Sequence, residues 1–217
     1  MIHHGRRSAR RGILAVVVAL VVLMPPTSSR AGETTDQVKA ELDQITAIVR
    51  DRGPKGAAKE EERSALVKER IFSWFDVQEM ATRSLAGHWA TRSDTERKEF
   101  VELFGDLFVE SYTRLVVDHL ADQQVNYLSE AVDGEVASVK TRFLSKREEP
   151  TFVDFALFRR DGAWAAYDVV IDDVSIVGTY RTQFNKIIRT QSYEALVKKM
   201  RLKQESEGLK RPGKDSR

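Results

Sequence analysis

The sequence predicts one α+β domain, in which helices surround a small antiparallel sheet of about four strands. Apolar residues recur at helical spacing from about residue 34 to residue 120. The pattern then alternates with a period of two as far as residue 171, and returns to helical spacing after it. Strands that follow one another directly, with runs of helices on either side, are typical of an α+β meander rather than of a parallel α/β sheet.

The chain has 217 residues, 41% hydrophobic and 31% charged, which is an ordinary globular composition. It contains no cysteine. Disulfides, thiol nucleophiles and cysteine-ligated metal centres are therefore excluded, and any metal would have to be held by His and carboxylate side chains.

Residues 1–31 have the pattern of a secretory signal peptide. Four arginines among residues 6–11 precede an apolar run from Ile13 to Met24, and two prolines follow the run. Ser29 and Ala31 supply small residues at the −3 and −1 positions of a cleavage site. Twelve helical residues rise about 18 Å, which is too short to cross a ~30 Å hydrocarbon core. We therefore predict export to the periplasm and cleavage near Ala31, before Gly32.

The predicted mature chain is slightly acidic. The first 31 residues contain five of the 35 basic residues and no acid, so the remainder carries a net charge of −3 against 33 acidic residues. A domain with this balance has no electrostatic support for nucleic-acid binding.

Two helices are predicted before residue 76. The first follows a Thr34 or Thr35 cap, and a second runs from about Lys59 to Phe75 after a Gly-Pro-Lys-Gly break. The apolar positions of the first are Val38, Leu42, Ile45, Ile48 and Val49, and those of the second are Leu66, Val67, Ile71, Trp74 and Phe75.

Two further helices have clear start signals. Asp76 is placed to cap a short helix over residues 77–85, which Gly87 would end. Ser93 and Glu96 form a capping box at the start of the longest helix, which extends to about Leu120. Its apolar face contains Phe100, Leu103, Phe104, Leu107, Phe108, Leu115 and Val116.

The strands are predicted over residues 125–128, 136–143, 151–159 and 164–171. Asp161-Gly162 is a strong two-residue hairpin signal between the last two strands. Helices are expected over residues 174–190 and 193–202. We assign residues 32–203 to the domain, and residues 204–217 to a disordered tail because they are almost devoid of apolar side chains.

Motifs for catalysis or metal binding are missing from the predicted mature chain. Only His88 and His119 remain after cleavage, and neither has a metal ligand at helical spacing. The adjacent carboxylates Asp172 and Asp173 would point to opposite faces of a strand, so we interpret them as a strand end and a helix N-cap. The sequence predicts a protein that is not an enzyme and that uses no cofactor.

Residues 164–184, WAAYDVVIDDVSIVGTYRTQF, resemble the signature of the MlaC family, the periplasmic phospholipid-binding proteins also named for toluene tolerance. Further likeness lies in Phe75-Asp76-Val77, in Ala86-Gly87-His88-Trp89 and in the segment from Tyr193 to Val197. The resemblance covers about residues 34–203. One departure is Asp173, where many relatives carry a glycine that would permit a positive φ.

The resemblance implies a carrier whose cavity holds lipid acyl chains between the sheet and the helices. Such a protein exchanges phospholipid with an outer-membrane lipoprotein–porin complex and with an inner-membrane ABC transporter, and so maintains outer-membrane lipid asymmetry. We expect a monomer that binds no nucleic acid.

We expect the cavity to be lined by apolar side chains from three helices and the sheet. The predicted lining residues are Ile71, Trp74, Phe75, Phe104, Phe108, Tyr112, Leu115, Val139, Phe155, Val169, Phe184 and Ile188. A second group, expected to be structural, is Asp168, Ser175, Tyr180 and Arg181. We expect Asp168 and Arg181 to fasten the helix after the last strand to the sheet, directly or through Asp172 and Ser175.

Two other functions stay open at this stage. One is a carrier of a different apolar lipid, such as a hopanoid. The other is an enzyme on a cone-shaped α+β fold, for which Asp154 would be the best titratable group inside a pocket. The simpler expectation for Asp154 is an ion pair with a basic neighbour such as Arg142.

Overall fold

The computed structural model describes residues 32–51, 57–145 and 149–206. The predicted signal peptide and residues 207–217 of the predicted tail lie outside these residues. Within the described ranges, no helix is long and apolar enough to cross a membrane.

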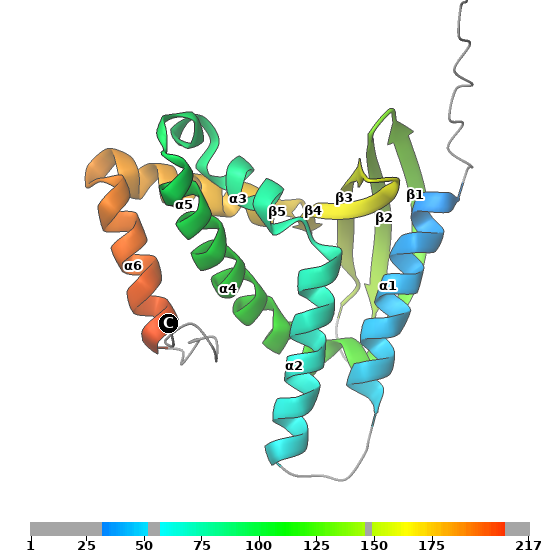
Figure 1. The fold of residues 1–217 in the computed structure, drawn as a ribbon. Helices are drawn as coiled ribbons and strands as arrows, with labels where there is room; N and C mark the ends of the chain where they lie inside the picture. Colours follow the sequence, from blue (N-terminus) through cyan, green and yellow to red (C-terminus); the bar gives the residue numbers. More distant parts are fainter. Residues whose placement is uncertain (1–31, 52–56, 146–148, 207–217) are drawn as a thin grey trace, which may run out of the picture.

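Helices form both ends of the described chain, and the sheet lies between them in sequence (Figure 1). The helices are α1 (Glu33–Arg50), α2 (Ala57–Trp74), α3 (Val77–Leu85), η1 (Ala86–Thr91), α4 (Asp94–His119), η2 (Leu120–Asp122), α5 (Ile176–Thr190) and α6 (Tyr193–Ser206). The strands are β1 (Gln124–Asp133), β2 (Val136–Leu144), β3 (Thr151–Arg160), β4 (Ala163–Ile171) and β5 (Val174–Ser175).

The sheet is an antiparallel meander in the order β1-β2-β3-β4-β5, which confirms the predicted α+β class. The predicted hairpin turn has left-handed backbone at both central residues, with φ of 50° at Asp161 and 84° at Gly162. Such a turn matches the right-handed twist of the strands that it joins. β1 is longer than predicted, because it continues from Leu128 to Asp133.

The fifth strand corrects the prediction of about four. Asp172 and Asp173 both adopt a positive φ, 45° and 65°, and turn the chain so that Val174 and Ser175 pair with β4. Asp173, which stands where the resemblance leads us to expect a glycine, thus has the left-handed conformation that a glycine would favour. Asp enters this region more easily than most residues. The helix cap is consequently Ser175, and not one of the two aspartates.

Local start signals operate as predicted in two helices. The Asp76 side chain accepts a hydrogen bond from the Glu79 N–H at 2.8 Å and begins α3. Ser93 and Glu96 form the reciprocal capping box at the start of α4. The end of α3 differs from expectation, because Ala86 is its C-cap, with φ 48°, and the chain continues into η1 through Gly87.

Two other predictions need correction. Leu66 of the predicted α2 stripe is 47% exposed, whereas Val67, Ile71 and Trp74 of the same stripe are buried. The last helix continues to Ser206, so residues 204–206 are helical rather than part of a disordered tail. Gln204 Nε2 donates to Asp106 Oδ2 at 2.7 Å, which holds this extra turn against α4.

The sheet has one packed face and one face with exposed apolar residues. Val139, Phe155 and Leu157 point toward the helices and are buried. Val136 and Phe152 lie on the opposite face and are 43% and 49% exposed. In Figure 1, α1 runs along the sheet, and α2 stands between this layer and α4. This arrangement leaves α1, α2, α4 and the inner face of the sheet around a common space.

A side chain of α1 and the backbone of the α2–α3 junction bond the edge of β4. The Gln37 amide bonds both backbone groups of Trp164, donating to its carbonyl at 2.6 Å and accepting from its N–H at 3.1 Å. Two residues further along, Phe75 forms a parallel bridge with Ala166, and the Asp76 N–H donates to the Ala166 carbonyl. These bonds use backbone groups that an edge strand would otherwise leave unpaired.

Candidate functional site

A cavity of about 360 Å³ lies between α1, α2, α4 and the inner face of the sheet. This volume falls at the lower end of the range for small-molecule sites, ≈ 300–1,000 Å³. Its lining is almost wholly apolar. The lining residues are Leu42, Ile45, Ile71, Trp74, Phe75, Phe108, Tyr112, Leu115, Val116, His119, Leu120, Gln123, Phe143, Thr151, Val153, Phe155, Val169, Ile171 and Ile176.

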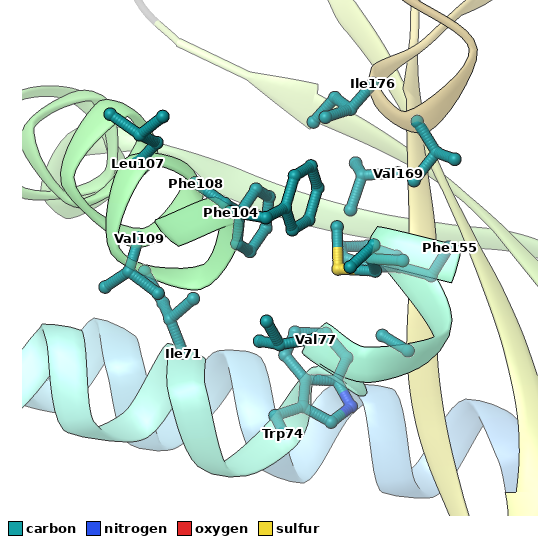
Figure 2. Close-up of a cluster of buried hydrophobic side chains, with 14 of the residues drawn as sticks. Ile71, Trp74, Val77, Phe104, Leu107, Phe108, Val109, Phe155, Val169 and Ile176 are labelled. Carbon is teal, nitrogen blue, oxygen red and sulfur yellow. The ribbon is translucent and has the colours of Figure 1, made fainter. Parts of the chain in front are cut away.

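Aromatic side chains form the inner end of the cavity. The ring of Trp74 lies 5.1 Å from that of Phe155 and 5.1 Å from that of Phe75, and Phe75 lies 5.3 Å from Phe108. Figure 2 shows Trp74 and Ile71 from α2 on one side and Phe108 from α4 on the other, with Phe155 and Val169 of the sheet beside them. This end offers only hydrocarbon and aromatic surface, apart from the Trp74 indole nitrogen.

The polar lining residues gather at the other end, with the exception of Tyr112. His119 ends α4 and Gln123 follows η2, while Thr151 begins β3. The strand register places Phe143 opposite Thr151 at this end of the sheet. His119 and Leu115 are exposed, so the polar end is also the end open to solvent. The cavity therefore grades from an aromatic floor to a polar mouth.

Tyr112 sits between these two ends. Burial, with smaller contributions from the nearby Tyr180 and Asp168, raises the pKa of its phenol to about 12. Its ring lies 5.1 Å from that of Phe108. The phenol is thus a neutral group at neutral pH, able to donate or accept a hydrogen bond inside a mostly apolar lining.

The structure brings together eight of the twelve residues predicted for the cavity. These are Ile71, Trp74, Phe75, Phe108, Tyr112, Leu115, Phe155 and Val169. The other four, Phe104, Val139, Phe184 and Ile188, are not part of its lining.

The length of α4 explains why Phe104 and Phe184 do not line the cavity. Its 26 residues extend about 39 Å, so one apolar face meets different partners along its length. Near its N-terminal half, Phe104 stacks in a filled aromatic cluster with Phe100, Tyr180 and Phe184. Phe108, one turn later, reaches the cavity. Val139 is fully buried on the inner face of β2, and Ile188 packs at the edge of the core on α5.

Some lining residues were absent from the sequence prediction although the pattern contains them. Val153 and Ile171 each lie two residues from a predicted sheet position, and Phe143 lies four residues from Val139, so each shares the face of its predicted neighbour. Leu42 and Ile45 belong to the apolar stripe of α1. His119 and Gln123 had no such signal, because only the packing of the α4 end against the sheet makes them neighbours of the mouth.

Of the predicted structural residues, Asp168 and Ser175 adjoin residues that line the cavity. Asp168 Oδ2 accepts from the Ser175 hydroxyl at 2.5 Å, and its Oδ1 accepts from the Val177 N–H at 3.0 Å. Ser175 Oγ in turn accepts from the Gly178 N–H at 2.7 Å. Arg181 is exposed, and the hydrogen bonds of Asp168 within the described chain go to Ser175 and to backbone N–H groups rather than to Arg181. Tyr180 packs on Phe104 and Phe184.

The carboxylate considered for catalysis lies outside the cavity. Asp154 is on the opposite face of β3 and pairs with Lys140, at 3.7 Å, rather than with Arg142. The register explains this choice, because Lys140 is its direct cross-strand partner. Among the described residues, no cluster of three or more His, Asp or Glu side chains is arranged to hold a metal ion.

Comparison with known proteins bears on this arrangement. The profile of the family described as MlaC protein matches residues 39–202. A solved structure, a phospholipid-binding protein from Ralstonia solanacearum in complex with a phospholipid, has the same fold with a TM-score of 0.68. The two sequences are 18% identical over a superposition that covers 80% of this chain and 97% of the other.

Proposed function

Because this chain belongs to the MlaC family, we propose that its cavity binds the acyl chains of phospholipid. We further propose that the protein is exported to the periplasm and carries lipid there between the outer membrane and an inner-membrane ABC transporter. In this role it is a binding protein and not an enzyme, and it needs no cofactor.

The observation that carries the proposal is the graded cavity. Hydrocarbon chains gain free energy wherever they leave water for apolar surface, and the aromatic floor around Trp74, Phe108 and Phe155 provides such surface. A phosphate-bearing headgroup needs water or hydrogen-bond donors. The mouth at His119, Gln123 and Thr151 offers both, since it is polar and open to solvent. A single ligand class, the amphipathic lipid, matches both ends.

The fold likeness to a phospholipid complex supports the same ligand. That protein was solved with a phospholipid bound, and the superposition with this chain covers 97% of its residues. A family profile that spans residues 39–202 includes every residue that lines the cavity.

Energetics favour transfer by contact with a partner. Two acyl chains with about 30 buried CH₂ groups, at ~0.8 kcal/mol each, correspond to a gross transfer free energy on the order of 24 kcal/mol. Release of such a ligand into water would be far too slow for transport. Exchange therefore requires a docked acceptor that offers another apolar site, for which the transporter and an outer-membrane lipoprotein–porin complex are the proposed partners.

Native mass spectrometry of the mature protein, purified without detergent, tests the proposed ligand. We expect a mass increment equal to one phospholipid, and lipid extraction followed by tandem mass spectrometry would identify its class. A delipidated sample should regain the increment after exposure to phosphatidylglycerol vesicles.

The other outcomes have distinct readings. Recovery of a polycyclic lipid without phosphorus would replace phospholipid with a hopanoid-like ligand in the same cavity. A protein that carries no lipid from cells and takes up none from vesicles would refute the carrier proposal.

A further inference from the structure

The N-terminal residue of the predicted mature chain faces a carboxylate. The Gly32 N–H donates to Glu130 Oε1 at 3.0 Å. Three residues later, the Thr35 N–H and hydroxyl both donate to Glu130 Oε2 at 2.7 Å. Glu130 lies on β1, far away in sequence, so these bonds join the start of α1 to the edge of the sheet.

Gly32 is held in place on both sides of its α-carbon. Its carbonyl accepts the first helical hydrogen bond, from the Asp36 N–H at 2.8 Å. Its ψ of −15° sets where its own nitrogen lies relative to this carbonyl, and that torsion does not include the residue that cleavage removes. The nitrogen of residue 32 is therefore directed at the carboxylate by backbone geometry, and does not depend on a mobile side chain.

The Glu130 carboxylate is ionised but has no cation beside it. Burial raises its pKa, yet the hydrogen bonds from Thr35 and Gly32 together outweigh burial and lower the pKa overall. In the described part of the chain, no Lys or Arg forms an ion pair with Glu130. The charged residues of α1 are Glu33, Asp36, Lys39, Glu41, Asp43 and Arg50, and those of the neighbouring strand β2 are Lys140 and Arg142. Glu33 pairs with Arg159 of β3 at 3.9 Å, and Lys140 pairs with Asp154 at 3.7 Å.

We propose that Glu130 is the receiving site for the α-ammonium group that signal-peptide removal creates on Gly32. Hydrolysis of the Ala31–Gly32 peptide bond by a signal peptidase consumes one water, leaves a carboxylate on Ala31 and leaves a protonated amine on Gly32. The amide N–H that bonds Glu130 thereby becomes a cation at the same place, and a hydrogen bond becomes an ion pair. The new positive charge, which the dipole of α1 would repel, is neutralised by the carboxylate.

Removal of the signal peptide would therefore change the structure locally, because the new terminus forms an ion pair that fastens the start of α1 to β1. A chain that retains even one residue before Gly32 moves its charge away from Glu130. The inference rests on export and cleavage at Ala31, and not on lipid binding, so either proposal can fail without the other.

The test compares two forms of the mature chain, one that begins at Gly32 and one that begins at Ala31, both released from a fusion partner. The pH dependence of the Gly32 Cα–H chemical shift reports the pKa of the α-amino group. In the Gly32 form we expect a pKa at least about one unit above the usual value near 8, and in Glu130→Gln we expect it to return to that value. Asp133→Asn, an exposed carboxylate at the end of the same strand, is the matched control and should change nothing.

A second measurement protects the test against a variant that folds poorly. Between pH 6 and 7 the urea midpoint of the Gly32 form should exceed that of the Ala31 form, and Glu130→Gln should remove this difference. An α-amino pKa near 8 in the Gly32 form, or equal midpoints for the two forms, would overturn the proposal. So would N-terminal sequencing of exported protein that begins at a residue other than Gly32.

Discussion

Asp168 and Ser175 are joined by a 2.5 Å hydrogen bond that connects the last long strand to the start of α5. The same carboxylate accepts from the Val177 N–H, while Ser175 caps the helix through the Gly178 N–H. One side chain thus organises both the strand end and the helix start. Because Val169 and Ile176, next to this junction, line the cavity, the bond also fixes part of the candidate site.

Replacing Asp168 should destabilise the protein strongly. Asp168→Ala leaves the Ser175 hydroxyl and the Val177 N–H without their acceptor, and each partly buried unsatisfied group costs about 1–3 kcal/mol. We expect a total loss of about 3 kcal/mol in the free energy of unfolding, measured by urea denaturation followed by circular dichroism. Arg181→Ala is the matched comparison and should change stability by less than ~0.5 kcal/mol, as exposed sites do. Similar losses for the two variants would contradict this account.

Filling the cavity should separate lipid loading from stability. Val153 lines the cavity on β3, so Val153→Trp would place an indole in space that we assign to the ligand. We expect bound phosphorus to fall close to zero, while delipidated protein loses less than the ~1–3 kcal/mol that overpacking a filled core costs. Val136→Trp, on the exposed face of the sheet, should retain lipid. Undiminished loading in Val153→Trp would argue against acyl chains in this cavity.

Ionisation of Tyr112 should lower the stability of the fold at alkaline pH. Burial, with smaller contributions from Tyr180 and Asp168, raises its folded pKa to about 12, against about 10 in an unfolded chain. The folded state holds this proton more tightly, so the contribution is fully present below pH 10 and is lost as the pH rises toward 12.

In Tyr112→Phe, the urea midpoint should therefore fall less steeply between pH 10 and 12 than in the parent protein. The reduction is expected to be partial, because burial also raises the pKa of Tyr127 and of Tyr193 to about 12. Absorbance at 295 nm would report the corresponding loss of one late-titrating phenol, and identical titration curves would refute the assignment.

Ala86 offers a stabilising substitution. It ends α3 with φ 48° and ψ −125°, a conformation that strains a residue with a Cβ by about 1–3 kcal/mol. Ala86→Gly removes the strain and loses about 0.4–1 kcal/mol through the greater freedom of the unfolded chain. We expect a net gain of roughly 1 kcal/mol in urea denaturation, with Ala90→Gly, an exposed site in η1, as the destabilising control. A loss of stability in Ala86→Gly would show that this backbone is not strained.

Local chemistry made much of the fold predictable. Asp76 and Ser93 bond backbone N–H groups only three residues away, and Asp161-Gly162 need only their own backbone preferences, so each acts as the sequence indicates. Helical spacing also predicted that Phe108, Tyr112 and Leu115 of α4 share a face, and all three line the cavity. The sequence of β3 is apolar on both faces, so its alternation alone did not decide which face is the inner one.

Tertiary structure decided what lies far apart in sequence. The apolar residues of α4 form one continuous stripe in the sequence, yet Phe104 contacts α5 and Phe108 lines the cavity. A long straight helix extends beyond any one neighbouring element, so its two halves pack against different partners. The carboxylate of Glu130 reaches the first turn of α1, and Asp168 bonds Ser175 while Arg181 stays in solvent. Periodicity fixes which face of an element is apolar, but it carries no information about which neighbour that face meets. The cavity is set by how the elements are spaced, and that spacing arises only when all of them pack together.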